Sequence, residues 1–375
     1  MEQKLRIIIS GGGTGGHIFP AVSIANAIRA KRPDADILFV GALGRMEMQR
    51  VPAAGYEIVG LPICGFDRKN LFKNFAVLFK IWKSQRMARR IIRRFRPMAA
   101  VGVGGYASGP TLNECAKHGI PCLIQEQNSY AGVTNKLLAK KVDCICVAYD
   151  GMERFFPAEK ILKTGNPVRQ ALLDVKMTKA EALRSFGLDE AKKTVLIVGG
   201  SLGARTMNES VMSHLEDIKA SGVQFIWQTG KYYNASINER LADRTDLPML
   251  KVLDFISDMG AAYRAADLVI SRAGASSISE FCLIGKPVIL VPSPNVAEDH
   301  QTKNAMALVE KDAALYVKDA EAPEKVITLA LETVRNDARL AALAANIKKL
   351  ALPDSADVIA DKVIELARKS EKVRK

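Results

Sequence analysis

The stretch LRIIISGGGTGGHIFPA, residues 5–21, joins a short apolar run to a glycine-rich turn and a helix. The run at 5–10 is continuous rather than alternating, which is typical of a parallel strand buried on both faces. Pro20 suits the first turn of the helix that follows. A second stretch, TVLIVGGSLGAR at 194–205, repeats the strand and the glycine turn. The sequence therefore predicts two α/β units, each begun by a strand and a glycine loop.

In the rest of the chain, short apolar runs alternate with helical patterns of 10–15 residues. This alternation predicts βαβ units and doubly wound parallel sheets. Seven more strands are expected, at 37–41, 99–104, 121–125, 143–148, 224–228, 268–271 and 287–291. We place the boundary between the units near 165–169, which gives a first domain at 1–165 and a second at 166–350.

Composition excludes several classes of protein. The chain has 375 residues, of which 48% are apolar and 25% charged, an ordinary globular mixture. Its six cysteines show no C-x-x-C spacing, which argues against a disulfide scaffold or a zinc site. The N-terminal apolar stretch is too short for a signal peptide, and no run approaches the ~18–20 apolar residues of a membrane span. We expect an intracellular protein that neither is secreted nor crosses a membrane.

The net charge of +14 is concentrated in two places. Segment 64–96 has eleven Lys and Arg against Asp67, and segment 367–375 has five against Glu371. The rest of the chain has equal numbers of basic and acidic residues and so carries no net charge. Two basic patches on a neutral protein favour a local anionic surface as partner over diffuse binding of nucleic acid.

Three glycine-rich turns each follow a predicted strand: GGGTGGH at 11–17, GVGGYASGP at 102–110 and GGSLGAR at 199–205. Glycine lets backbone N–H groups approach a phosphate, and a helix N-terminus behind the loop favours negative charge. The first loop contains G-x-G-x-x-G, but the second strand ends in Gly41, where a dinucleotide site has an acidic residue. A nicotinamide-dependent dehydrogenase is therefore disfavoured.

The run SRAGASSISEFCLIGKPVILVP at 271–292 leads from a strand through a small-residue turn into a helix that carries Glu280. One interpretation is a capping box, with Ser277 as N-cap and Glu280 three residues later. The other places the Glu280 carboxylate where it accepts hydrogen bonds from a ribose diol. The two interpretations are compatible.

Seven motifs together resemble one family. GGGTGGHIFPA, GVGGYASGP, QEQNSYAGVTNK, GNPVR, GGSLGAR, DFISDM and RAGASSISE occur in the order and spacing of the MurG family of peptidoglycan N-acetylglucosaminyltransferases. The resemblance covers nearly the whole chain. It implies a GT-B fold, with two Rossmann-like doubly wound parallel-sheet domains facing across a cleft, and a C-terminal helix at 351–375 that crosses back to the first domain and ends in a basic tail.

The resemblance also implies an activity: inverting transfer of GlcNAc from UDP-GlcNAc to the muramoyl 4-hydroxyl of undecaprenyl-diphospho-muramoylpentapeptide, without a metal or other cofactor. The protein would act at the cytoplasmic face of the bacterial plasma membrane, as a peripheral protein. Stabilising the departing diphosphate would fall to backbone N–H groups, a helix N-terminus and an arginine.

Site residues follow motif by motif. The donor-binding residues that the resemblance implies are Thr14, Gly15, Gly16, Asn128, Arg169, Ser201, Ile256, Ala275, Ser276, Ser277, Glu280 and Gln301. Arg169 and Ser201 are expected near the diphosphate, Ile256 at the uracil, residues 275–280 at the ribose and phosphates, and Gln301 at sugar hydroxyls. The acceptor is expected at Gly104, Gly105 and Tyr106, although Tyr106 also fits simple loop packing.

Two residues compete for the role of general base. His17 closes the first glycine loop, although a histidine at a helix start is often structural. Glu126 is the alternative, and it could equally be a satisfied carboxylate at a strand end. Two positions depart from the commonest family pattern: Gln125 replaces a histidine before EQN, and Leu202 replaces a glutamine in GGSLGAR.

The spacing of apolar residues in the basic segment predicts an amphipathic helix. Its apolar side chains are Leu71, Phe72, Phe75, Leu78, Phe79 and Trp82, and Lys73, Lys80, Lys83 and Arg86 flank them. Such a helix usually packs on its own sheet. Aromatic side chains beside a dense cationic rim instead favour insertion at an anionic membrane surface, where each basic residue contributes about 1 kcal/mol.

Two other functions remain to be weighed. A GT-B enzyme that makes a membrane glycolipid would share the R-x-G-A…S-E region and a basic face, but QEQNSYAGVTNK is not expected in it. A nucleic-acid-binding protein would use segment 64–96, yet the sequence contains no recognised nucleic-acid module, and the neutral remainder offers no extended basic channel. We therefore expect no nucleic-acid partner.

Overall fold

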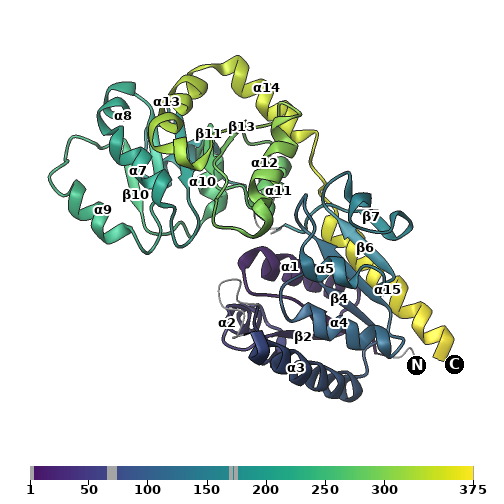
Figure 1. The fold of residues 1–375 in the computed structure, drawn as a ribbon. Coiled ribbons are helices and arrows are strands. Elements are labelled where there is room, and N and C mark those ends of the chain that lie inside the picture. Colours follow the sequence, from purple (N-terminus) through teal and green to yellow (C-terminus); the bar gives the residue numbers. More distant parts are fainter. Residues whose placement is uncertain (1–3, 66–73, 169–171, 173–175, 375) are drawn as a thin grey trace. The chain divides into compact units, whose positions relative to one another are not determined.

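The structure is a computed structural model that describes residues 4–65, 74–168, 172 and 176–374 (Figure 1). The chain divides into two compact units. The N-terminal unit comprises residues 1–168 and 352–375, and the C-terminal unit comprises residues 169–351. Each unit is built on its own parallel sheet.

The N-terminal unit has a seven-stranded sheet in the order β3-β2-β1-β4-β5-β6-β7. Every neighbouring pair is parallel. The strands are β1 (Arg6–Ser10), β2 (Asp36–Ala42), β3 (Glu57–Leu61), β4 (Ala99–Gly102), β5 (Cys122–Glu126), β6 (Cys144–Val147) and β7 (Ile161–Lys163). The order changes direction at β1, so the loops after β1 and β4 leave the sheet side by side at its carboxyl edge, where ligands bind in folds of this kind.

Helices cover both faces of this sheet. They are α1 (Gly15–Lys31), α2 (Glu47–Ala53), α3 (Asn74–Phe95), α4 (Ser108–Lys117), α5 (Val133–Leu138) and the C-terminal α15 (Ser355–Arg374). One apolar core joins α1 and α15 to the face that carries Ile7 and Ile9. The other joins α3, α4 and α5 to the face that carries Ile8 (Figure 1). Because both faces are covered, the central strands are apolar throughout.

The C-terminal unit has a six-stranded parallel sheet in the order β10-β9-β8-β11-β12-β13. Its strands are β8 (Thr194–Val198), β9 (Gln224–Gln228), β10 (Leu250–Leu253), β11 (Leu268–Ser271), β12 (Val288–Leu290) and β13 (Leu315–Tyr316). Its helices are α6 (Lys179–Ser185), α7 (Arg205–Ser213), α8 (Leu215–Ser221), α9 (Asn234–Leu241), α10 (Met259–Ala265), α11 (Ala275–Ile284), α12 (His300–Val309), α13 (Ala322–Arg335) and α14 (Asp337–Lys348). The strand order reverses at β8, which brings the loops after β8 and β11 together.

The prediction of two Rossmann-like parallel sheets is confirmed, and the nine predicted strands are all present. The sequence reasoning missed four strands: β3, β7, β10 and β13. All four lie at the edges of the sheets. Helix α3 is the longest helix of the first unit, and within the described residues no helix has the length and apolar character needed to cross a bilayer.

Candidate functional site

The first two glycine loops touch each other at the carboxyl edge of the N-terminal unit. A Cβ atom added to Gly105, in the loop after β4, would lie 2.4 Å from the carbonyl oxygen of Gly12, in the loop after β1. Gly105 also has a φ of +84°, which L side chains rarely adopt. Only glycine lets the two backbones approach this closely, so the loops form one surface.

His17 lies on this surface, in the first turn of α1. Its Nδ1 is 3.0 Å from the Gly12 carbonyl oxygen and 3.5 Å from the Thr14 hydroxyl. Its Nε2 lies toward the second loop, because a Cβ atom on Gly104 would be 2.9 Å from it. A carbonyl oxygen only accepts hydrogen bonds, so the bond to Gly12 requires the proton on Nδ1. In the neutral ring, Nε2 is then the basic nitrogen.

Glu47 is a buried carboxylate beneath the first glycine loop, and sequence reasoning did not identify it. It is 1% exposed. Its Oε2 accepts a 2.8 Å hydrogen bond from the Gly13 N–H, and its Oε1 accepts a 2.9 Å bond from the Ala42 N–H. A Cβ atom on Gly12 would lie 2.2 Å from the Glu47 Cδ, and one on Gly41 would lie 2.6 Å from its Cγ. Gly41 therefore makes room for this acidic side chain.

Glu126 ends β5 and holds the loop that follows it. Its Oε1 accepts bonds from the Asn128 backbone N–H at 3.1 Å and the Asn128 side-chain amide at 3.3 Å. Its Oε2 accepts bonds from the Gly132 N–H and the Asn135 amide, both at 2.9 Å. Gln127 ties this loop to the second glycine loop, because its Nε2 donates to the Val103 carbonyl at 2.9 Å. Glu126 is thus fully engaged in ordering the Asn128 loop.

Tyr106 follows the two glycines of the second loop and is 49% exposed. Its phenol ring lies over Gly65, where an added Cβ atom would be 2.3 Å from the hydroxyl oxygen. The side chain therefore packs against Gly65 at its hydroxyl end and is otherwise half exposed. This arrangement allows both the loop-packing and the acceptor-binding interpretation.

In the C-terminal unit, Gln228 at the end of β9 joins the loops on either side. Its Oε1 accepts a 2.9 Å bond from the Ile256 N–H, and its Nε2 donates to the Gly200 carbonyl at 3.1 Å. Ile256 is buried, with its N–H taken by Gln228, so its carbonyl oxygen is the backbone group that it can offer to a base. Ser201, next to Gly200, is exposed at the edge of the same loop.

The turn after β11 leads directly into α11, which starts at Ala275 with Gly274 as its N-cap. No side chain accepts a hydrogen bond at this cap, and no acidic residue lies in the first turn. Within the described residues, the Ser276 hydroxyl oxygen is buried without a hydrogen-bond partner. A helix N-terminus with an unsatisfied hydroxyl is suited to an anionic oxygen.

The capping-box interpretation of Glu280 is wrong, because the helix begins two residues before Ser277. Glu280 lies in the second turn of α11 and is 6% exposed. Its Oε2 accepts a 3.1 Å hydrogen bond from the hydroxyl of Tyr263 on α10. The Tyr263 ring in turn packs edge-on against Phe281, with ring centroids 5.6 Å apart. Tyr263 was not identified from the sequence; the Asp258 N-cap of α10 was the available signal for this helix.

Two further polar residues complete this edge. Arg272 forms an ion pair with Asp319 and donates a hydrogen bond to the Val291 carbonyl at 3.1 Å. These contacts of the guanidinium stabilise the turn after β11. Gln301 on α12 accepts a 2.8 Å bond from the Ser293 N–H through Oε1. The side-chain NH₂ is therefore the group that Gln301 would offer to a sugar hydroxyl.

The predicted residues fall into two groups, one on each unit. The N-terminal unit carries the first group, on adjoining loops and on the helix start and strand end that border them: Thr14, Gly15, Gly16, His17, Gly104, Gly105, Tyr106, Glu126 and Asn128. The second group lies at the carboxyl edge of the sheet of the C-terminal unit and comprises Ser201, Ile256, Ala275, Ser276, Ser277, Glu280 and Gln301. Arg169, Leu71, Phe72 and Lys73 lie outside the described residues, as does the side chain of Phe75.

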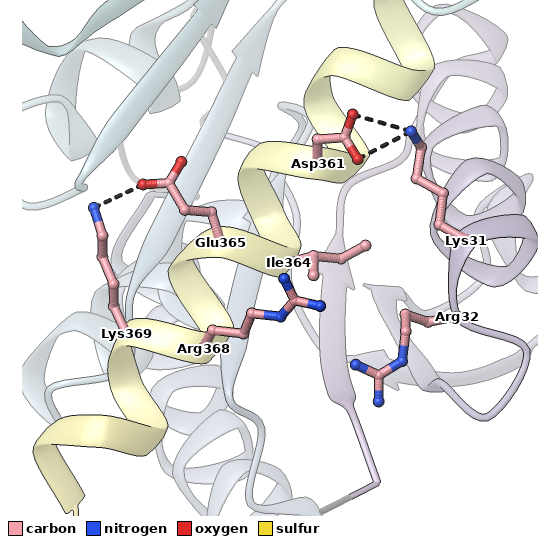
Figure 2. Close-up of a pocket in the computed structure, with 7 residues that line it drawn as sticks. All are labelled: Lys31, Arg32, Asp361, Ile364, Glu365, Arg368 and Lys369. Atoms are coloured by element: carbon pink, nitrogen blue, oxygen red, sulfur yellow. Dashed lines mark hydrogen bonds and ion pairs between the residues drawn. The ribbon is translucent and has the colours of Figure 1, made fainter. Parts of the chain in front are cut away.

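A cavity of about 620 Å³ lies elsewhere, at the far end of α1 against α15 (Figure 2). Its charged side chains are largely paired with one another: Lys31 contacts Asp361 at 2.9 Å, and Lys369 contacts Glu365 at 2.7 Å. Lys369 and then Lys362 lower the pKa of the Glu365 carboxyl to about 2, so it is ionised at neutral pH. The Lys31–Asp361 pair joins α1 to α15 and so helps to anchor the C-terminal helix, whereas the Lys369–Glu365 pair lies within α15 itself.

In the described part of the chain, His, Cys, Asp and Glu side chains do not gather in threes as they would around a metal ion. The six cysteines are free thiols.

Comparison with known proteins gives the family. Residues 7–147 match the glycosyltransferase family 28 N-terminal domain, and residues 194–359 match the C-terminal domain of the same family. The chain is 69% identical to the UDP-N-acetylglucosamine--N-acetylmuramyl-(pentapeptide) pyrophosphoryl-undecaprenol N-acetylglucosamine transferase of Phocaeicola vulgatus, over 99% of both chains. It is 61% identical to the transferase of that name from Parabacteroides distasonis, over 98% of this chain and all of the other.

Solved structures agree. The crystal structure of MurG from Acinetobacter baumannii superposes with a TM-score of 0.77 at 29% identity, covering 96% of this chain and 99% of the other. A kitacinnamycin glycotransferase superposes with a TM-score of 0.72 at 14% identity, over 97% and 100%, which shows the fold alone. The chain therefore belongs to glycosyltransferase family 28 and, within it, to the MurG family of N-acetylglucosamine transferases.

Proposed function

We propose that the protein transfers GlcNAc from UDP-GlcNAc to the 4-hydroxyl of lipid-linked MurNAc-pentapeptide, with inversion at the anomeric carbon. The observation that carries this proposal is similarity over the whole chain, 69% to one relative that is named for this transfer. A glycolipid-forming enzyme of the same fold is the alternative, and it has no comparable support.

His17 is the proposed general base. The attacking hydroxyl has to lose a proton as the glycosidic bond forms, and an imidazole nitrogen is suited to accept it near neutral pH. The 3.0 Å bond from Nδ1 to the Gly12 carbonyl supports this role, because it makes Nε2 the basic nitrogen and directs it toward the acceptor loop. Glu126 is the weaker candidate, since both of its oxygens already accept hydrogen bonds.

The N-terminus of α11 is the proposed site for the UDP diphosphate. Charge accumulates on this leaving group as the sugar departs, and fixed N–H dipoles stabilise it without reorganisation. The buried Ser276 hydroxyl and the absence of an acidic side chain from the first helical turn support this role. Glu280 would then accept hydrogen bonds from the ribose, and Gln301 would donate to the sugar.

The decisive test is release of UDP from UDP-GlcNAc with a short-chain analogue of the muramoylpentapeptide lipid, in the presence of EDTA. We expect full activity, which would establish both the acceptor and a mechanism without a divalent metal. A parallel reaction with UDP-glucose and diacylglycerol should release no UDP. Activity only in the parallel reaction would overturn the acceptor assignment, and activity lost to EDTA and restored by Mg²⁺ would overturn the metal-free mechanism.

We further propose that the outer face of α3 binds an anionic membrane surface, where the lipid-linked acceptor resides. Phe79 is 62% exposed and Trp82 is 49% exposed, and their rings stack with centroids 5.8 Å apart. Among the α3 side chains that the structure describes, the buried ones are instead Ser84, Ala88 and Ile92. The exposed aromatic pair is therefore not part of the core, and exposed Lys80, Lys83 and Arg86 surround it.

Vesicle sedimentation tests this surface. The full chain should bind vesicles that contain phosphatidylglycerol and should not bind vesicles of phosphatidylcholine alone. The double variant Phe79→Ala/Trp82→Ala should lose most of this binding, whereas Tyr232→Ala, which removes an aromatic ring that is 75% exposed on the other unit, should keep it. Equal binding by all three proteins would contradict the proposal.

A further inference from the structure

One peptide group connects Glu47 to His17. The Gly13 N–H, which donates to the Glu47 Oε2 at 2.8 Å, belongs to the peptide that joins Gly12 and Gly13. The other end of this same peptide is the Gly12 carbonyl, whose oxygen is 3.0 Å from the His17 Nδ1. A trans peptide holds its N–H and C=O on opposite sides, so the carboxylate and the imidazole bind its two ends.

We propose that Glu47 orients His17 and increases its basicity through this peptide. A carboxylate that accepts the N–H polarises the amide and makes its carbonyl oxygen a stronger acceptor. Hydrogen bonds in such a chain strengthen one another, by about 10–30% each in condensed phase. The stronger bond holds the proton on Nδ1, and the nearby negative charge favours the imidazolium that forms when Nε2 takes a proton. Glu47 is a positioning residue, since it acts on the ring only through the peptide.

The local geometry is built around this chain of contacts. Gly12 and Gly13 have φ values of +147° and +91°, and a side chain at Gly12 would collide with the carboxylate. Gly105 covers the carbonyl end, where an added Cβ atom would be 2.4 Å away. Glu47 is also held from its far side by the Ala42 N–H at 2.9 Å. Both ends of the peptide are therefore enclosed, and the carboxylate cannot rotate without losing two hydrogen bonds.

The same contacts distinguish the first glycine loop from a dinucleotide-binding loop. In a dinucleotide-binding loop, the backbone N–H groups face a phosphate. Here an internal carboxylate takes the Gly13 N–H and places negative charge under the loop. The Gly13 N–H is therefore not available to a phosphate, and the carboxylate beneath it favours a base that becomes positive.

Several groups surround the imidazole. The first loop contributes the Gly12 carbonyl and the Thr14 hydroxyl, and the second contributes the backbone of Gly104. Glu47, from α2, contributes the carboxylate that the contacts above link to the ring through one peptide. The catalytic consequence of this link rests on the proposed role of His17 as base; its effect on the ring itself does not.

The first experiment therefore uses the free protein. The chain has four histidines, so each ring can be assigned by ¹⁵N NMR with single His→Gln variants. In the wild type, neutral His17 should carry its proton on Nδ1. In Glu47→Gln, which removes the charge, its titration midpoint should fall by about 0.5 pH unit or more. The matched control is Glu114→Gln, another buried carboxylate of this unit, paired with Lys117, which should leave His17 unchanged.

The second experiment measures transfer as a function of pH. Glu47→Gln should lower kcat about 10-fold or more, as loss of a residue that orients another commonly does. The acidic limb of kcat/KM should move to lower pH, because a less basic nitrogen is deprotonated at lower pH. Glu47→Asp, which keeps the charge, should recover part of both effects.

These outcomes separate the two proposals. A proton on Nε2 of neutral wild-type His17 would overturn the proposed link between Glu47 and His17 even if Glu47→Gln failed to fold. An unchanged His17 midpoint in a folded Glu47→Gln protein would overturn it as well. Failure of the wild type to transfer GlcNAc would overturn the proposed function, and the NMR result would still decide the link between Glu47 and His17.

Discussion

Two strand-to-helix turns of this protein start their helices in the same way but differ in what lies beneath them. The turn after β1 enters α1, and the turn after β11 enters α11. Both helices begin without a side-chain cap or an acidic residue in the first turn. Under the first turn, the Glu47 carboxylate takes a loop N–H. At the second, Tyr263 holds the Glu280 carboxylate in the second helical turn, behind the helix start.

This difference indicates which sign of charge each turn can stabilise. A carboxylate beneath a helix start disfavours an anion there and offsets the positive end of the helix, whereas a helix start without such a carboxylate stabilises an anion. The turn after β1 is therefore the better place for a base that becomes positive, and the turn after β11 for a leaving group that becomes negative. Four substitutions break or sharpen this contrast.

The largest effect is expected at the turn after β1. Replacing His17 with Ala should lower kcat by about 10²–10⁴-fold, because proton removal from the acceptor hydroxyl loses its base. The KM for UDP-GlcNAc should change little. Steady-state kinetics measure both, and His118→Gln, a histidine at the end of α4, serves as control with near-normal activity. A decrease in kcat of less than 10-fold for His17→Ala would contradict the assignment of the general base to the turn after β1.

At the turn after β11, Glu280→Gln should weaken binding of UDP about 10–100-fold, since hydrogen bonds to a charged acceptor contribute about 1.5–3 kcal/mol. Isothermal titration calorimetry with UDP and 2′-deoxy-UDP gives the comparison. The wild type should prefer UDP, and the variant should bind both nucleotides similarly. A variant that keeps the full preference for UDP over 2′-deoxy-UDP would show that Glu280 does not bind the ribose hydroxyls.

Tyr263→Phe should weaken UDP binding by about 2–12-fold, because it removes one hydrogen bond to the Glu280 carboxylate. The effect should disappear in the Glu280→Gln background, since Tyr263 acts through that carboxylate. Tyr316→Phe, on the edge strand β13, is the matched control. If the effects of Tyr263→Phe and Glu280→Gln add fully, Tyr263 supports the fold of α10 rather than the ribose contact.

The smallest effect is expected for Ser276→Ala. The hydroxyl is buried without a partner in the described residues, so removing it should leave the Tm unchanged or slightly raised. The affinity for UDP should nevertheless fall about 3-fold, because the phosphate loses a donor. Thermal unfolding with and without UDP tests both parts. A lower Tm together with an unchanged affinity would make the hydroxyl structural.

The central strands of both sheets were predictable because each is buried on both faces and therefore reads as a continuous apolar run. The four strands that sequence reasoning missed are the edge strands. Glu57, Lys163 and Lys251 lie on three of them, and the fourth, β13, has only two residues. A strand that is half exposed or very short has no continuous apolar run, so tertiary pairing alone defines it.

The sequence by itself determined the two-unit α/β fold, the family, and the loops that carry the candidate site, because these depend on local patterns of apolar residues, glycines and helix starts. Only the tertiary structure decided what lies under those loops. Glu47 is 34 residues from Gly13, and Tyr263 is 17 residues from Glu280. No local pattern links such pairs, since it is the packing of neighbouring strands and helices that brings their side chains together.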